Sequence, residues 1–230
     1  MKQDFTLFSV PHLLILAAIP TIALVCSVWS RGKPTRTRWI CFSLGTVIAT
    51  NELTSYAYRI HNGLVRFPDG LPFHLCDITL WITVIAIFTL KPWSFELAYF
   101  WGLAGTTMAL LTPDLWVSFP SYPAIQFFLA HGSVVIAVLY MTWTKLTWLR
   151  RGCVGRALII LNAYAVVVGI FNAILKTNYL YLCEKPGRIS LLEYLGPWPV
   201  YIIGGEVLAV LFFILLWLPF RRGSAYDRLQ

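Results

Sequence analysis

The chain has 230 residues, of which 58% are hydrophobic and only 12% are charged, and its mean hydropathy is +0.71. Because a soluble domain carries about twice that share of charged residues, the composition excludes an ordinary soluble domain and predicts an integral membrane protein. The net charge of +8 is then explained by basic loops between apolar segments, and we expect no nucleic-acid partner.

Seven apolar segments follow one another along the chain, each close to the length of about 20 residues that crosses a bilayer as a helix. Each is hydrophobic all round rather than on one face, as in buried helices. The predicted spans are residues 8–29, 39–60, 73–90, 94–112, 121–143, 154–176 and 198–220. We therefore predict an all-α fold, a polytopic membrane bundle of seven transmembrane helices within a single integral membrane domain, residues 1–230.

The basic residues predict the orientation, because Lys and Arg accumulate in cytoplasmic loops. They gather in residues 31–38 of the first loop, at Lys91 in the third, in residues 145–156 of the fifth and in residues 221–228 after the last span. In a chain with seven spans these alternate connections share one side. We predict a multi-pass protein of the cell membrane with its N-terminus outside and its C-terminus in the cytoplasm.

Polar side chains inside a membrane are costly and indicate functional sites. On the predicted topology most of them lie in the outer half of the membrane, whereas the inner half contains almost no comparable polar residues. They include Asn51, Glu52, Arg59, His74, Cys76, Asp77, Asp114, His131, Asn172, Lys176, Asn178, Tyr201 and Glu206. The set predicts a polar cavity open toward the outside or the outer leaflet. For any single residue the alternative is an ion pair or hydrogen bond that holds helices together.

The segment LPFHLCDI, residues 71–78, opens the third span. Pro72 suits the first turn of a helix, which places Cys76 where the helix dipole favours a thiolate. His74 and Cys76, two residues apart, point to different faces, whereas His74 and Asp77, three apart, share a face. Asp77 is therefore a candidate to orient His74, and we expect the base for Cys76 to come from another span.

His131, near the middle of the fifth span, is the candidate base, which gives a Cys–His nucleophile hypothesis. Glu52 or Asp114 is the candidate carboxylate that orients the histidine. One alternative is a disulfide between Cys76 and Cys183, which also lies on the predicted outer side. Another is that Cys76 is an inert, buried thiol.

A zinc site is a further alternative for the same region. Its ligands would be His74, Cys76, Asp77 and His131, but the sequence contains no paired spacing typical of zinc sites. We therefore expect no metal and no cofactor.

The segment FNAILKTNYLYLCEKPGRISLLEYLGPWPVY, residues 171–201, alternates polar and aromatic residues. It would cap the cavity at the level of the lipid headgroups. Basic residues placed to meet a lipid phosphate are Lys176, Lys185 and Arg188. The alternative is an ordinary interfacial loop with Trp198 and Tyr201 as aromatic anchors.

LPFHLCDI, AHG at 130–132, NYLYLCEKP and LGPWPVY resemble, in the same order, motifs of the YwaF-type bacterial integral membrane family. The resemblance extends from about residue 45 to residue 203 and implies seven helices. That family is similar to an animal multi-pass membrane protein that acts as a phospholipid acyltransferase through a cysteine. The resemblance thus implies that Cys76 and His131 carry acyl transfer, whereas Cys183 departs from the family pattern.

We expect a membrane-embedded acyltransferase, or acyl hydrolase, whose partners are membrane lipids. Cys76 would attack an acyl ester of a phospholipid while His131 or His74 takes its proton. The predicted substrate-binding residues are Asn51, Glu52, Arg59, Asp77, Asn172, Lys176, Asn178, Tyr179, Lys185, Trp198 and Tyr201. The alternative is a seven-helix transporter or small-molecule receptor without catalysis, although the sequence lacks the repeat pair common in transporters.

Overall fold

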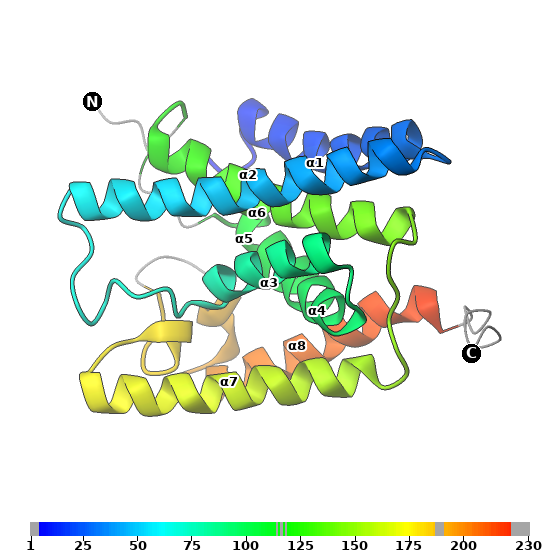
Figure 1. Cartoon of the computed structure of the whole chain (residues 1–230). Helices are drawn as coiled ribbons and strands as arrows, with labels where there is room; N and C mark the ends of the chain where they lie inside the picture. Colours follow the sequence, from blue (N-terminus) through cyan, green and yellow to red (C-terminus); the bar gives the residue numbers. More distant parts are fainter. Residues whose placement is uncertain (1–4, 114, 116, 118, 187–190, 222–230) are drawn as a thin grey trace. The chain divides into compact units, whose positions relative to one another are not determined.

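A computed structural model describes residues 5–113, 115, 117, 119–186 and 191–221 (Figure 1). Every regular element within these residues is a helix, which confirms the all-α prediction. The chain divides into two compact units, unit 1 (Met1–Trp148) and unit 2 (Leu149–Gln230).

Each predicted span coincides with a helix or a run of helices, because long apolar runs favour helices whose backbone groups bond internally. Unit 1 contains α1 (Val10–Ser30), α2 (Pro34–His61), α3 (Leu75–Thr89), α4 (Pro92–Leu97), the π-helix η1 (Ala98–Thr106), α5 (Thr107–Leu111) and α6 (Tyr122–Trp143). Unit 2 contains α7 (Cys153–Leu175), the 3-10 helices η2 (Tyr179–Tyr181) and η3 (Leu191–Leu195), α8 (Val200–Trp217) and the 3-10 helix η4 (Leu218–Phe220).

Within the described residues, four helical segments are long and apolar enough to cross a membrane, and they are Val10–Ser30, Tyr122–Trp143, Cys153–Leu175 and Val200–Phe220. The apolar helix α3 has 15 residues, a length of about 22 Å at the usual rise per residue, against about 30 Å for the hydrocarbon core. The 28-residue α2 is long enough but carries more polar side chains. These findings support a membrane protein, whereas the seven spans and the orientation stay predictions.

α6 forms the centre of unit 1, where it packs against α1, α2, α3 and η1. A Cβ added at Gly132 would lie 3.2 Å from Ile19 Cδ1, so the glycine permits a close approach of α1 to α6. Ile19, Phe128 and Val135 belong to the buried core cluster at this contact. Neighbouring helices therefore surround α6, whereas α1 keeps apolar surface available to lipid.

The predicted span 94–112 is a helix whose middle, η1, is a π-helix of nine residues. Such segments have i→i+5 hydrogen bonds and occur frequently at functional sites. A Cβ added at Gly102 would lie 3.1 Å from Val134 Cγ1 on α6 and 3.7 Å from Thr79 Cγ2 on α3. Glycine at this position lets η1, α3 and α6 meet closely.

The buried His12 joins the start of α1 to the end of α5. Its Nδ1 accepts the backbone N–H of Phe8 at 3.0 Å. The proton therefore lies on Nε2, which donates to the carbonyl oxygen of Leu110 at 2.8 Å. Because both ring nitrogens have partners, His12 has a structural role that the sequence alone does not reveal.

In unit 2, α7 packs against α8 and η2. A polar contact links the two long helices, since Asn162 Nδ2 donates to Glu206 Oε1 at 2.8 Å. Hydrogen bonds of this kind help hold membrane helices together. Glu206, one of the polar residues noted in the sequence, thus has an interhelical role.

Candidate functional site

The start of α3 is fixed by a capping arrangement. His74 is the N-cap residue, and Asp77 Oδ2 accepts its backbone N–H at 3.2 Å. The carboxylate thereby satisfies a backbone donor at the helix start, as in a capping box. Pro72 precedes the helix rather than lying in its first turn, which corrects the prediction for this residue. Cys76 is the second residue of α3 and lies in its first turn, in which the backbone N–H groups of Asp77 and Ile78 donate to the carbonyl oxygen of His74 at 3.1 and 3.3 Å.

Five of the predicted site residues gather where α2 ends and α3 begins. We call this group the α2–α3 cluster, and its members are Glu52, Arg59, His74, Cys76 and Asp77. The charges of Asp77 and Arg59 act on Glu52. The charge of Arg59 also interacts electrostatically with His74 and Asp77. The carboxylates of Glu52 and Asp77 interact in the same way with the thiol of Cys76. Electrostatic interactions thus connect a thiol, an imidazole, two carboxylates and one guanidinium into one group.

α6 begins at this same end of unit 1. The rings of Tyr58 on α2 and Tyr122 on α6 have centroids 4.4 Å apart. Asn51 Nδ2 donates to the carbonyl oxygen of Gln126 at 3.4 Å, which links α2 to α6. Asn51 and Glu52 are both buried, with exposed fractions of 8% and 5%. Asn51 therefore holds two helices together beside the charged cluster.

His131 lies on α6 in a defined tautomer. Its Nδ1 is 2.8 Å from the carbonyl oxygen of Phe127, and a carbonyl can only accept, so the proton lies on Nδ1. The ring stacks on Phe127 with centroids 4.1 Å apart and an interplanar angle of 29°. Nε2 consequently carries the lone pair and forms no hydrogen bond with a described residue. This is the tautomer that a general base requires.

Thr79 on α3 and Val134 on α6 both meet Gly102 of η1. Cys76 and His131 lie three residues before them in the sequence. α3 and α6 also pack directly against each other. No hydrogen bond joins the thiol to the imidazole among the described residues. The packing of α3, η1 and α6 therefore brings the two helices together without forming a closed catalytic dyad.

Cys76 and Cys183 are both free thiols, the first partly buried and the second exposed. Within the described part of the chain, no three His, Cys, Asp or Glu residues form a group that could hold a metal ion. Two candidates, Asp114 as an orienting carboxylate and Arg188 as a phosphate ligand, lie outside the described residues.

In unit 2 the predicted residue Asn172 organises the loop after α7. Its Oδ1 accepts the hydroxyl of Thr177 at 2.7 Å and the backbone N–H of Tyr179 at 3.0 Å. Its Nδ2 donates to the carbonyl oxygen of Tyr179 at 2.9 Å. Asn172 is 1% exposed, so the whole amide is used to fold the loop. Lys176, in the left-handed conformation with φ 57°, ends α7.

Asn178 has a similar role a few residues later. Its Oδ1 accepts the backbone N–H groups of Cys183 and Glu184 at 3.0 and 3.2 Å. Its Nδ2 donates to the carbonyl oxygen of Glu184 at 2.9 Å. Asparagine commonly stabilises turns in this way, and this signal was available in the sequence.

The aromatic residues that precede and begin α8 also hold this loop. Trp198 Nε1 donates to the carbonyl oxygen of Leu182 at 3.0 Å, and the Tyr201 hydroxyl donates to that of Tyr181 at 2.6 Å. Lys185 Nζ lies 3.4 Å from Glu193 Oε2 and 5.8 Å from the centroid of the Tyr201 ring. The polar groups of this loop are therefore largely engaged with one another, while their predicted contacts with substrate stay predictions.

Comparison with known proteins shows what the chain is similar to. A family model described as the TMEM164 family matches residues 7–217. The chain is also similar to an uncharacterized protein of Treponema pallidum (strain Nichols), with 30% identity over 157 residues that make up 66% of this chain and 63% of that protein. The match thus spans less than two thirds of the length of this curated relative. No solved structure matches the chain significantly.

Proposed function

The chain belongs to the TMEM164 family, and for this membrane protein we propose the function of a phospholipid acyltransferase, or acyl hydrolase, that uses Cys76 as its nucleophile. The observation that carries the proposal is the position of Cys76 in the first turn of α3, within the α2–α3 cluster. The resemblance to YwaF-type proteins and to a cysteine-dependent acyltransferase supports the same chemistry. A cysteine nucleophile supplies this chemistry without a cofactor.

The proposed reaction begins when His131 Nε2 takes the proton of the Cys76 thiol. The sulfur forms a bond with the acyl carbonyl carbon of a phospholipid, and the ester C–O bond breaks. The departing lysophospholipid oxygen receives the proton from Nε2. In the second half, Nε2 takes a proton from the hydroxyl of an acceptor lipid or of water. That oxygen attacks the thioester, and Cys76 leaves and regains its proton.

The first turn of α3 supports the charged intermediate of this reaction. The first two of its backbone N–H groups, those of Leu75 and Cys76, have no backbone partner among the described residues, and the positive end of the helix dipole lies at the same place. Donors arranged in this way stabilise the oxyanion that forms on the acyl carbonyl oxygen. Binding of the reacting carbonyl at this turn therefore follows from the position of Cys76.

Arg59 is the proposed ligand for the lipid phosphate in the α2–α3 cluster. Its guanidinium lies 5.6 Å from the centroid of the Tyr56 ring and forms no ion pair with a described residue. The negative charges of Glu52 and Asp77 attract this guanidinium. An arginine that is held in place but not neutralised by a direct contact suits recognition of a phosphate.

The proposal includes seven spans in one integral membrane domain, an outer N-terminus, a cytoplasmic C-terminus and multi-pass insertion in the cell membrane. The α2–α3 cluster then faces the outer leaflet, so its substrates are membrane lipids. The four apolar helical segments support the membrane location in this proposal.

The test compares wild-type protein with Cys76→Ala and with the matched control Cys183→Ala in lipid nanodiscs that contain an isotope-labelled lysophospholipid. We expect wild type and Cys183→Ala to produce labelled diacyl lipid and a hydroxylamine-sensitive thioester on the peptide that contains Cys76. Cys76→Ala should lose both signals while its unfolding temperature stays close to that of wild type.

Acyl transfer by folded Cys76→Ala protein would refute the proposal that Cys76 is the nucleophile. Lipid binding by wild type without turnover or a thioester would instead favour a receptor or transporter. Lipid mass spectrometry and peptide mapping distinguish these outcomes.

A further inference from the structure

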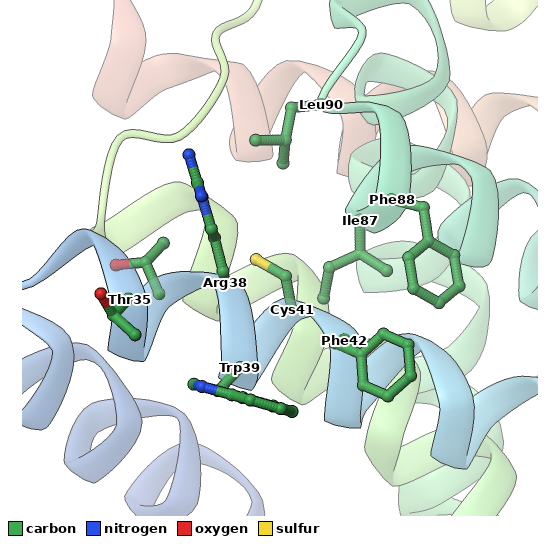
Figure 2. Close-up of a pocket in the computed structure, with 9 residues that line it drawn as sticks. Thr35, Arg38, Trp39, Cys41, Phe42, Ile87, Phe88 and Leu90 are labelled. Atoms are coloured by element: carbon green, nitrogen blue, oxygen red, sulfur yellow. The ribbon is translucent and has the colours of Figure 1, made fainter.

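Two cavities lie at the other end of unit 1, where α2 begins and α3 ends. The first has a volume of about 670 Å³ and is mainly apolar, and Figure 2 shows residues of α2 facing the end of α3. Phe42 and Phe88 meet at one side, with ring centroids 6.3 Å apart, and Cys41 and Ile87 also line the cavity. Arg38 is the charged residue in this lining.

The second cavity, of about 840 Å³, lies where α1 ends, α2 begins and α6 ends. It shares Arg38 and Thr37 with the first cavity. Its basic residues are Arg31, Lys33, Arg38 and Lys145. No acidic residue lines either cavity. Uncompensated positive charge in a concave site favours an anionic ligand.

The four cations of this cavity are available for a ligand. None of their side chains has a hydrogen bond or an ion pair with a described residue. The nearby Arg36 differs, because its guanidinium donates to the carbonyl oxygen of Trp29 at 3.0 Å and lies 4.7 Å from the centroid of the Trp29 ring. Lys33 caps α2 without a side-chain hydrogen bond, so the positive end of that helix dipole adds to the field at this cavity.

Three exposed tryptophan side chains favour a position of this end of unit 1 at the level of the lipid headgroups. Trp29 and Trp143 lie at the ends of α1 and α6, Trp39 lies near the beginning of α2, and their exposed fractions are 53%, 44% and 64%. Tryptophan is enriched at membrane interfaces, where its ring contacts both hydrocarbon and water. At this depth a basic cavity suits the phosphate of a phospholipid headgroup, and the apolar cavity beside it suits an acyl chain.

We propose that this end of unit 1 binds one anionic phospholipid of the adjacent leaflet. The phosphate of the headgroup lies in the basic cavity, and an acyl chain extends into the apolar cavity beside Phe42 and Phe88. Arg38 stands at the junction, where the glycerol backbone joins the two parts of the lipid. The site is separate from the α2–α3 cluster at the opposite end of α2, so the proposal does not depend on catalysis by Cys76.

Native mass spectrometry of the full chain in detergent tests the site. The probes are dioctanoyl phosphatidylglycerol, which is anionic, dioctanoyl phosphatidylcholine, which has no net charge, and inorganic phosphate. We expect wild type to bind phosphatidylglycerol at least about tenfold more tightly than phosphatidylcholine, and inorganic phosphate weakly. Equal binding of the two lipids to wild type would overturn the proposal, and this comparison requires no variant. If inorganic phosphate bound as tightly as phosphatidylglycerol, the ligand of the site would be a free anion and not a lipid.

Variants locate the binding. Arg38→Gln and Lys145→Gln should each weaken phosphatidylglycerol binding about fivefold and leave phosphatidylcholine binding nearly unchanged. Lys91→Gln removes one positive charge from an exposed position that lines neither cavity and is the matched control. Phe42→Ala should weaken the binding of both lipids, since it shortens the apolar wall. Equal losses for Lys91→Gln and Arg38→Gln would show that general surface charge, and not this site, binds the lipid.

Discussion

The α2–α3 cluster in unit 1 and the loop after α7 in unit 2 contain similar polar residues, but they use them differently. In the loop, the amide of Asn172 has three hydrogen-bond partners, and Asn178 has a similar set. In the cluster, Glu52, Arg59 and Asp77 act on one another through their charges and form no ion pair among the described residues. The hydrogen bonds of the loop thus use its polar side chains for folding, whereas the charged groups of the cluster are joined mainly by electrostatic interactions.

The largest expected effect concerns His131, whose Nε2 is available in the structure. In His131→Ala the rate of acyl transfer should fall by about 100-fold to 10,000-fold, because a general base contributes about that much. Lipid mass spectrometry measures the rate. The matched control is His12→Ala, which removes a histidine with two hydrogen bonds and should lower the unfolding temperature without this specific loss of rate. Full activity in folded His131→Ala protein would assign the base to another residue.

Asn172→Ala tests the structural role of the hydrogen bonds in the loop after α7. The substitution leaves both backbone groups of Tyr179 and the hydroxyl of Thr177 without their partner, and it should lower the free energy of unfolding by about 2–4 kcal/mol. Thermal unfolding in detergent measures the loss. Asn172→Asp keeps an acceptor for Thr177 and Tyr179 but sets a carboxylate oxygen against the carbonyl oxygen of Tyr179, so it should be destabilised as well. A stable variant with a raised KM for lipid would instead place Asn172 in the substrate site.

Tyr201→Phe removes one hydrogen bond and keeps the ring. The hydroxyl donates to the carbonyl oxygen of Tyr181 at 2.6 Å, and its loss should reduce the free energy of unfolding by about 1 kcal/mol. The acyl-transfer rate should stay unchanged, because the hydroxyl is engaged with the loop. A large loss of rate at unchanged stability would contradict this structural role.

The smallest effect is expected for Lys185→Gln. Lys185 and its partner Glu193 have side chains that are 22% and 44% exposed, and partly exposed ion pairs contribute about 0–1 kcal/mol. Neither the unfolding temperature nor the acyl-transfer rate should change measurably. A marked rise in KM for anionic lipid alone would restore the predicted role of Lys185 in binding a lipid phosphate.

The positions of the helices were largely predictable, because runs of apolar residues long enough to satisfy their own backbone in lipid favour helices. Proximity within LPFHLCDI was also predictable, since residues three apart on a helix share a face. The capping contact of Asp77 with the backbone of His74 differs from the predicted orientation of the imidazole, because the helix begins at Leu75 and makes Asp77 its third residue.

The π-helix η1 was not predictable from apolar run length. Its sequence reads as an ordinary apolar span, and the i→i+5 register accompanies close packing of Gly102 against α3 and α6. The basic cavity could not be predicted from the sequence for a related reason. Arg38 and Lys145 are far apart in the sequence, and only the packing of α1, α2 and α6 places them in one lining.

A helical protein suited to a membrane could be predicted from the residues alone, because these properties depend on local composition and on the lengths of apolar runs. The sequence also placed Cys76 at the start of a helix. Which polar groups form hydrogen bonds and which stay available could be seen only in the folded chain, because their neighbours come from segments that folding brings together. Asn172 with Tyr179, His12 with Leu110, and Arg38 with Lys145 are the pairs in which that difference is visible.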